Sequence, residues 1–463
     1  MLRRLILVAI IFALTFGTGC FSGIGPEEIV SFVLSDGSGN TFIGYRVQKG
    51  QDDHEIHLQK VDPNGTVLWD RSLPVDKGRR ASIIGMAGGE KGSVYVAWEV
   101  LGPEGQRHSA SITRLARIDA NGQINFQKEF AERGIQLIAV DAGSVILHQT
   151  RDEVSRSIHL EVDAGCVILN QTNDEEFHAV RFDGDGNRLW SHKIPGRVGL
   201  KLVPGINGET LMMWQHPDYP YFVVQKLDAS GDAMWGQEGM PEGIRIKHLE
   251  TALQVEPQII SDGSGGAIIS WAEMTGSGMP SYVWACRIGD DGQVHSAEPV
   301  RDLTSTINTQ IRVVTDSQLG AIVIWEDHRD GMALYTKRNN PLISSLWPEN
   351  GVPVCTDLPD VSPRFEAAAS GAGGVAVAWI DGDRKLYAQM LDTSGQKQWG
   401  DDGVLIAKGV CNQPVKLCGD NQVGFIVGWS TGAEAYHPND SFVQKIDGEG
   451  NLMWGENGIK LKP

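Results

Sequence analysis

The sequence predicts an all-β fold, a β-propeller of eight four-stranded blades, from two repeated signatures and their spacing. The first signature is an acidic, glycine-rich turn followed by an apolar run that ends in Trp, as in SDGSGGAIISW at 261–271. The second is Asp-x-x-Gly-x-x-x-Trp, as in DGEGNLMW at 447–454. Copies of the second signature, some of them degenerate, end at 69, 126, 190, 235, 296, 347, 399 and 454. A spacing of roughly fifty residues matches the four-stranded blade of propeller repeats.

Composition favours many short strands joined by tight turns. The chain has 463 residues, of which 56 are Gly and 13 are Trp, and it lacks heptad repeats, long charged runs and Ser/Pro-rich linkers. These features indicate a strand-rich repeat rather than a helical protein. Because no linker divides the repeats, we expect a single propeller domain over residues 29–463.

Each repeat is expected to contain four strands in a fixed order. An apolar first strand, such as 258–261, leads into the glycine-rich turn, and the second strand runs to the Trp. This second strand is apolar on both faces, as a strand between two blades must be. A third strand such as 442–446 alternates in polarity, and the Asp-x-x-Gly turn reverses it into a short fourth strand. The Trp side chains are expected to fill the space between adjacent blades.

The glycines after the acid are interpreted as turn residues and not as a phosphate-binding loop. Glycine supplies the positive φ that tight turns need, and Asp can hydrogen-bond nearby backbone. The same turn recurs in equivalent positions along the chain, and no copy opens a helix, which a nucleotide-binding loop requires.

The third repeat is longer than the others. Residues 140–153, VDAGSVILHQTRDE, return almost unchanged as VDAGCVILNQTNDE at 162–175. This near-identity indicates that a strand–turn–strand piece has been duplicated. It predicts an extra hairpin in the third blade, with a partial ninth blade as the alternative.

The N-terminus, MLRRLILVAIIFALTFGTGC, has the features of an export signal over residues 1–19. Its end, Gly-Thr-Gly-Cys, resembles the lipobox of bacterial lipoproteins, although Gly17 stands where that family usually has Leu. The resemblance implies lipidation of Cys20, a lipid-anchored tether over 20–28, and an exported protein held in the cell envelope, at the outer membrane because no Asp follows the Cys. The alternative is a plain secretory signal that is cleaved nearby.

Charge and cysteine content exclude some classes of function. The formal net charge is −18 and the basic residues are scattered, so we expect no nucleic-acid partner. Five cysteines remain after Cys20, and an odd number in an exported protein does not form a complete disulfide framework. We expect a monomer whose contact with a membrane is limited to the lipid anchor.

The repeat units resemble known propeller families. Asp-x-x-Gly-x-x-x-Trp is similar to the tryptophan-docking motif of quinoprotein-type eight-bladed propellers, with one residue fewer between Asp and Gly and without the Thr before that Gly. It also resembles, with different spacing, the Asp-box of sialidase-like propellers. The units are most similar to exported bacterial repeat proteins with DGxGG…W…DxxGxxxW units, a pattern that implies the fold and no assigned activity.

Both signature turns are expected on one face of the propeller, so that the longer loops gather on the other face. Three of those loops contain polar and aromatic groups suited to ligand binding. The candidate ligand-binding residues are His216, Asp218, Tyr219 and Tyr221 in one loop, Asp327, His328 and Arg329 in a second, and Tyr436 and His437 in a third. The alternatives are that the first cluster packs locally on the rim and that the second is a solvated, self-paired turn.

Motifs for metals and catalysis are incomplete. Asp183-Gly-Asp185-Gly-Asn187 lacks the acid that completes an EF-hand calcium loop. His54 and His57 lack the helical spacing of a zinc protease and would face opposite sides of a strand. We therefore expect no metal site, no cofactor and no catalytic residues.

These observations favour a surface-anchored, non-catalytic binding or scaffold propeller. Its long-loop face would contact a protein, a peptide or a glycan. The alternative is an exported hydrolase or lyase that acts on polysaccharide, with side chains from several blades converging on one pocket.

Overall fold

A computed structural model shows how the repeats are arranged. It describes residues 27–50, 53–101, 112–130, 133–138, 165–171, 177–183, 188–194, 198–215, 221–236, 243–246, 253–274, 280–302, 310–328, 331–340, 345–358, 363–370, 373–411, 414–420, 423–432 and 440–461. These residues form eight four-stranded antiparallel sheets, and each sheet is built from four strands that are consecutive in the chain.

The first four sheets follow the order expected within one repeat. Their strands are β1 (Glu27–Ser35), β2 (Thr41–Gly50), β3 (Asp53–Val61) and β4 (Val67–Leu73); β5 (Ala81–Gly88), β6 (Val94–Val100), β7 (Ile112–Ile118) and β8 (Ile124–Phe130); β9 (Arg133–Ile138), β10 (Gly165–Gln171), β11 (Phe177–Asp183) and β12 (Arg188–Ile194); and β13 (Val198–Pro204), β14 (Thr210–Gln215), β15 (Phe222–Leu227) and β16 (Ile244–Ile246). A short 3-10 turn, η1 (Glu90–Gly92), lies between β5 and β6.

The remaining sheets repeat this order. Their strands are β17 (Leu253–Ser261), β18 (Ala267–Met274), β19 (Pro280–Ile288) and β20 (Val294–Asp302); β21 (Ile311–Thr315), β22 (Ala321–Asp327), β23 (Met332–Asn339) and β24 (Val352–Leu358); β25 (Arg364–Ala369), β26 (Val375–Ile380), β27 (Lys385–Leu391) and β28 (Val404–Lys408); and β29 (Lys416–Gly419), β30 (Phe425–Thr431), β31 (Asp440–Ile446) and β32 (Ile459–Lys460).

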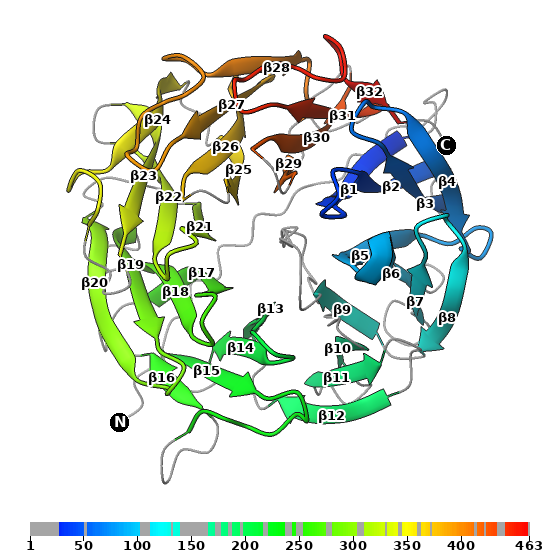
Figure 1. Cartoon of the computed structure of the whole chain (residues 1–463), viewed down its shortest axis with the longest axis horizontal. Helices are drawn as coiled ribbons and strands as arrows, with labels where there is room; N and C mark the ends of the chain where they lie inside the picture. The colour runs from blue at the N-terminus through cyan, green and yellow to red at the C-terminus, as the bar shows by residue number, and fades with distance from the viewer. Residues whose placement is uncertain are drawn as a thin grey trace, which may run out of the picture.

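The sheets are arranged as blades around a central axis (Figure 1). The first strand of each sheet is the innermost, and these strands contact one another in a closed circle from β1 through β5, β9, β13, β17, β21, β25 and β29 back to β1. The all-β class and the propeller architecture predicted from the repeats are confirmed.

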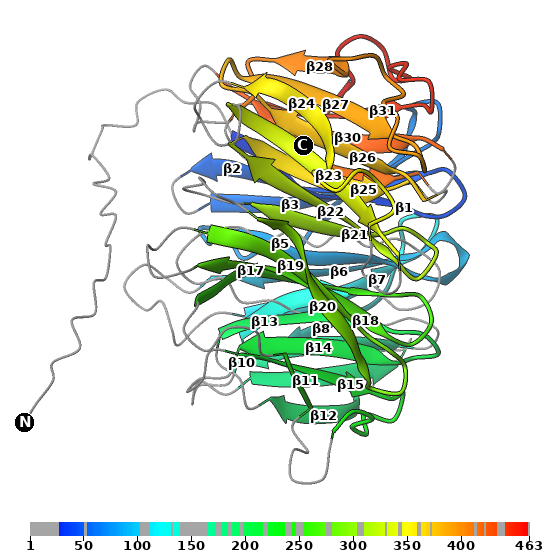
Figure 2. The ribbon, with the colours of Figure 1, turned by 90° about the vertical axis from the view of Figure 1, so that its left-hand side faces the viewer.

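The strands run between the two faces of the ring, as the side view shows (Figure 2). Because the strands of a blade are antiparallel and consecutive, the turns between its first and second strands lie on the same face as the turns between its third and fourth strands. We call this the turn face. The opposite face, where second strands are connected to third strands and each blade to the next, is the loop face.

The Asp of the first turn organises that turn through its side chain. Asp262 Oδ1 accepts hydrogen bonds from the backbone N–H groups of Ser264 and Gly266, both at 2.8 Å. A Cβ on Gly266 would lie 2.3 Å from the carbonyl oxygen of Ile288, so this glycine is required by close approach. The positive φ expected of these turns occurs instead at Gly263 and Gly265.

A buried ion pair joins this Asp to the third strand of the same blade. The pairs are Asp36 with Lys60 at 3.0 Å, Asp262 with Arg287 at 2.5 Å, Asp316 with Arg338 at 3.1 Å and Asp420 with Lys445 at 3.1 Å. We call this pair the clasp. In the fourth blade Glu209 supplies the carboxylate to Lys226 at 2.9 Å.

The seventh blade lacks both members of the clasp. Ser370 takes the position of the acid and still accepts a hydrogen bond from the backbone N–H of Gly374 at 3.0 Å. Met390 takes the position of the cation, opposite Ala376 in the strand register. A buried charge without its partner is costly, so replacing both members together keeps the blade free of an uncompensated charge.

The Trp of the second signature joins six of the eight blades to the next blade; the second and fifth blades have Phe126 and Ser296 at this position. Its indole N–H donates to a backbone carbonyl in the second turn of the following blade. The donor and acceptor pairs are Trp69 with Ala120, Trp190 with Ala229, Trp235 with Asp290, Trp347 with Thr393, Trp399 with Gly448 and Trp454 with Pro63, at 2.9–3.2 Å. Signature glycines lie against several of these rings, as Gly65 does against Trp454.

The ring closes without exchanging a strand between its first and last sheets. Trp454, in the last blade, donates its indole N–H to the carbonyl of Pro63 in the first blade. Val30, Val33 and Tyr45 of the first blade pack with Ile426 and Trp454 of the last blade in one hydrophobic cluster. Ser35 Oγ in the first blade also donates to the backbone oxygen of Asp420 in the last blade at 3.3 Å. Packing and these two hydrogen bonds between side chain and backbone therefore hold the described part of this seam.

Part of the duplicated segment lies outside the described residues. Its first copy, 140–153, lies in that part, so the extra hairpin predicted for the third blade is not described. Within the described part of the chain, Cys286, Cys355, Cys411 and Cys418 are buried and are not joined in disulfides. Burial raises the pKa of Cys286 to about 12, which makes this thiol unreactive at neutral pH.

The clasp gives a prediction that the seventh blade suggests. Replacing Lys445 alone by Met leaves the buried carboxylate of Asp420 without its cation. We expect a loss of about 3–5 kcal/mol in the free energy of unfolding. The double variant Asp420→Ser, Lys445→Met copies the seventh blade and should lose less than either single variant. Denaturant unfolding of the four proteins measures this coupling. Additive losses would contradict the account of the clasp.

Candidate functional site

The described residues include three of the nine candidate ligand-binding residues. Tyr221, Asp327 and His328 are described. The others, His216, Asp218, Tyr219, Arg329, Tyr436 and His437, lie outside the described residues, as does the proposed lipidation site Cys20. The site is therefore built from the sixth blade, where two of the three described candidates are adjacent.

The polar group at the end of β22 is paired internally. Asp327 is buried, and its Oδ2 accepts a hydrogen bond from the indole N–H of Trp325 at 3.0 Å. His328 Nε2 lies 2.6 Å from Oε1 of Glu326, whose side chain is fully buried. The self-paired turn considered from the sequence is thus what this loop contains, and Asp327 serves to satisfy a buried indole.

The Glu326 and His328 side chains nevertheless form a dyad with one exposed member. The His328 side chain is 24% exposed at the loop face, whereas Glu326 has no exposure. A buried carboxylate orients the imidazole, and the imidazole remains available to a ligand or to proton exchange. The dyad is the group among the described loop-face residues with the clearest chemical capacity.

Tyr221 contributes to packing more than to the surface. It is 7% exposed and packs in a cluster with Leu202, Trp214 and Val223. The guanidinium of Arg245 lies 5.2 Å from the centroid of its ring. The described part of this loop therefore fits the alternative considered from the sequence, in which this cluster packs locally on the rim.

A second polar group, which the sequence reasoning missed, lies in the first blade at the closing seam. His57 in β3 lies 3.4 Å from Asp70 and 3.2 Å from Glu55, and its ring stacks on Tyr45 with centroids 5.2 Å apart. Gln59 Nε2 donates to Asp70 Oδ2 at 2.5 Å and to Tyr45 Oη at 3.0 Å.

Internal comparison of the repeats could have found this group. In four other blades the corresponding positions hold a Trp stacked on another aromatic ring. These pairs are Trp271 with Trp284, Trp325 with Tyr335, Trp379 with Tyr387 and Trp429 with Phe442. Among these five blades, the first is the one where the stack contains an imidazole, that of His57 on Tyr45.

The electrostatics of this group favour the charged forms of its members. Burial lowers the pKa of His57, but hydrogen bonds to Asp70 and Glu55 outweigh burial, and the pKa is raised above 6.5. Burial raises the pKa of Asp70, but its hydrogen bonds to His57 and Gln59 outweigh burial, and the pKa is lowered. The group is an ion-pair network within the seam.

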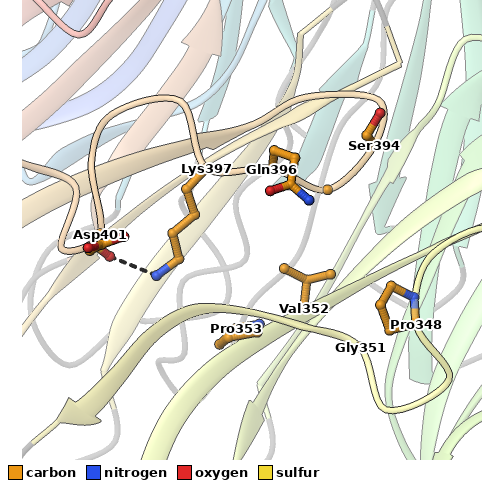
Figure 3. Close-up of a pocket in the computed structure, with 9 residues that line it drawn as sticks. Pro348, Gly351, Val352, Pro353, Ser394, Gln396, Lys397 and Asp401 are labelled. Atoms are coloured by element: carbon orange, nitrogen blue, oxygen red, sulfur yellow. Dashed lines mark hydrogen bonds between the residues drawn. The ribbon is translucent and has the colours of Figure 1, made fainter.

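A pocket of about 430 Å³ lies between the sixth and seventh blades at their outer turns (Figure 3). Pro348, Val352 and Pro353 form one wall, and Ser394 and Gln396 lie on the other. Lys397 also lines the pocket, and its Nζ donates to the backbone oxygen of Asp401 at 2.7 Å. The pocket has apolar and polar walls, and its ionisable lining residues are Lys397 and Asp401.

Metal ligands and membrane spans were sought in the same residues. No group of three or more His, Cys, Asp or Glu side chains within the described ranges could hold a metal ion. No helix in those ranges is long and apolar enough to span a membrane.

Comparisons with known proteins give distant propellers and no family. No protein-family model matches the chain, and no curated protein matches it. One similar solved structure is the β-propeller domain of the Trilobed protease from Pyrococcus furiosus, at 10% identity and a TM-score of 0.41, covering 81% of this chain and 96% of that one.

Two further structures are equally distant. The Dos1 propeller has 10% identity and a TM-score of 0.45, with 80% of this chain and 82% of that chain covered. TolB from Acinetobacter baumannii has 12% identity and a TM-score of 0.31, with 76% of each chain covered. Similarity at this level adds nothing about function.

The network around His57 gives a pH prediction. Because its pKa is raised, charged His57 stabilises the fold fully below pH 6.5, and this contribution is lost as pH rises through the folded value. The lowered pKa of Asp70 keeps its carboxylate charged throughout that interval. The difference in unfolding free energy between wild type and His57→Phe should therefore shrink from pH 6 to pH 8. A difference that does not change with pH would show that His57 is neutral in the fold.

Proposed function

We propose that this protein is a surface-anchored, non-catalytic binding or scaffold β-propeller whose loop face contacts a protein, a peptide or a glycan. The observation that carries the proposal is the contrast between its two faces. On the turn face the repeated Asp, Lys, Arg and Trp side chains bond to one another and to the backbone of the next blade. These repeated side chains are thus committed to structure.

The loop face varies from blade to blade. The connection from β2 to β3 is residues 51–52, whereas that from β6 to β7 is residues 101–111. Variable loops on a rigid frame are the usual location of binding residues. His328, with its partly exposed imidazole, lies on this face and provides a marker for it.

The proposal includes the complete ring and its anchor. We take the eight described sheets to be all the blades, with an extra hairpin in the third blade. Cys20 is the lipidated residue of an exported protein at the outer membrane. The chain acts as a monomer and needs no cofactor.

The anchor constrains which face lies near the membrane. β1 is an innermost strand that runs toward the turn face, so Glu27 lies at the loop-face end of the ring. The chain from Cys20 to Glu27 spans at most about 25 Å when fully extended. A lipid on Cys20 would hold the loop face toward the bilayer, which favours partners located at the membrane surface.

An exported hydrolase or lyase acting on polysaccharide is the second candidate. The Glu326–His328 dyad favours it, since an oriented imidazole at a partly exposed position can transfer protons. An enzyme needs further groups converging on the same substrate, which in this chain would come from the loops beside the dyad.

A binding screen tests the main proposal. The chain with Cys20→Ser, folded and immobilised, is probed with a glycan array and with purified envelope proteins. We expect a ligand whose capture is reduced at least tenfold by His328→Ala. The matched control is Met453→Ala, which changes a half-exposed residue of the turn face and should leave capture unchanged.

The same protein separates the two candidates. Release of reducing sugar from envelope polysaccharides that is abolished by His328→Ala would establish the enzyme. Capture that depends equally on Met453 and His328 would move the binding surface away from the loop face and contradict the proposal.

Lipidation is tested separately. Growth with an alkyne-bearing fatty acid should label the full-length protein and not the Cys20→Ser variant. Fractionation should place the labelled protein in the outer membrane. A wild-type protein that is unlabelled and released in soluble form would show that the signal is simply cleaved.

A further inference from the structure

One position of the repeat lies on the innermost strands and varies in chemical type. The second strand of these blades carries the signature Trp, or Tyr45 in the first blade. The position lies on the first strand, opposite the residue that comes just before that aromatic residue. Its occupants are Phe32, Gly85, Lys201, Gln258, Arg312, Glu366 and Lys416. We call these residues the axial ring, because their strands encircle the axis of the propeller (Figure 1).

The axial ring differs from the other polar positions of the repeat. The clasp and the docking Trp recur with the same partners in most blades, whereas this position changes from aromatic to small, polar, cationic or anionic. A position that varies while its surroundings repeat is not explained by the needs of the repeat. It carries three cations, Lys201, Arg312 and Lys416, and one carboxylate, Glu366.

The carboxylate of the ring is paired with only one of these cations. Arg312 Nε lies 3.1 Å from Glu366 Oε1, which also accepts the backbone N–H of Ala367. Glu366 is 3% exposed and the Arg312 side chain is 20% exposed. Lys416 is not within ion-pair distance of any carboxylate in the described part of the chain.

The Lys416 side chain is largely buried and has no hydrogen-bonding partner among the described residues, and its Nζ remains accessible to solvent. It is 7% exposed, and its Nζ lies 5.7 Å from the centroid of the Phe32 ring. The other well-buried lysines of the same blades differ, since Lys60 and Lys445 each pair with the acid of a clasp. Burial lowers the pKa of Lys416 to about 8, partly offset by Glu366, so that it remains mostly charged at pH 7.

Burying a charge without an opposite charge is unfavourable unless something else compensates it. We propose that the axial ring binds a small anion, a carboxylate or a phosphate, that pairs with Lys416, with Arg312 as the second cation and Phe32 as an apolar wall. The site is independent of any partner at the loop face, so each proposal can fail without the other.

Thermal unfolding of the full chain tests this site at pH 7. The probes are 50 mM sodium phosphate and 50 mM sodium succinate, each compared with sodium chloride at the same ionic strength. For wild type we expect at least one of the two anions to raise the unfolding midpoint by about 2 °C more than chloride does. Which anion does so distinguishes phosphate from carboxylate recognition.

Two variants make the result specific. Lys416→Met removes the unpaired charge, so it should fold at least as well as wild type in chloride and lose the extra rise. If the Lys416→Met variant does not fold, Lys416→Gln is used in its place. Lys445→Met is the control, which should lower the midpoint and keep the extra rise. No extra rise in wild type, or an equal rise in wild type and Lys416→Met, would overturn the proposal.

Discussion

The hydrogen bond from a second-signature indole to the next blade's turn is the interaction that links most neighbouring blades of this ring. A four-stranded sheet cannot bury both of its faces alone, so each blade is stable only against its neighbours. The indole fixes how the neighbours meet, because Trp69 can donate to Ala120 only when the second turn of the next blade is in place. The last of these contacts, from Trp454 to Pro63, closes the ring.

Buried charge is the second constraint, and the blades meet it in different ways. Four of them pair the acid after the first strand with a cation from the third strand, as Asp316 does with Arg338. The seventh blade omits both charges, and the first blade adds the network of His57 and Asp70. Lys416 is the exception, which is why the axial ring points to a ligand while the clasps point only to stability.

The sequence predicted the architecture because its strongest signals are local and periodic. Asp, Gly and Trp recur within eight residues, so the turn and the strand could be predicted from single repeats, and the blade length from the spacing between them. The partners of these residues could not. Lys60 and Asp36 are far apart in the chain, and only the register of β2 with β3 brings them together. The dyad of Glu326 and His328 was visible as a charged loop, but its pairing depended on burial of Glu326, which the local sequence does not specify.

Every described sheet consists of consecutive strands, and this has a consequence for the covalent order of the chain. Cutting the connection between any two blades and joining Leu461 to Glu27 would leave all eight sheets with the same four strands. The seam between the first and last blades would then be crossed by a peptide linkage like the others. The fold therefore does not require the chain to begin at the first blade, and circular permutants should form the same ring.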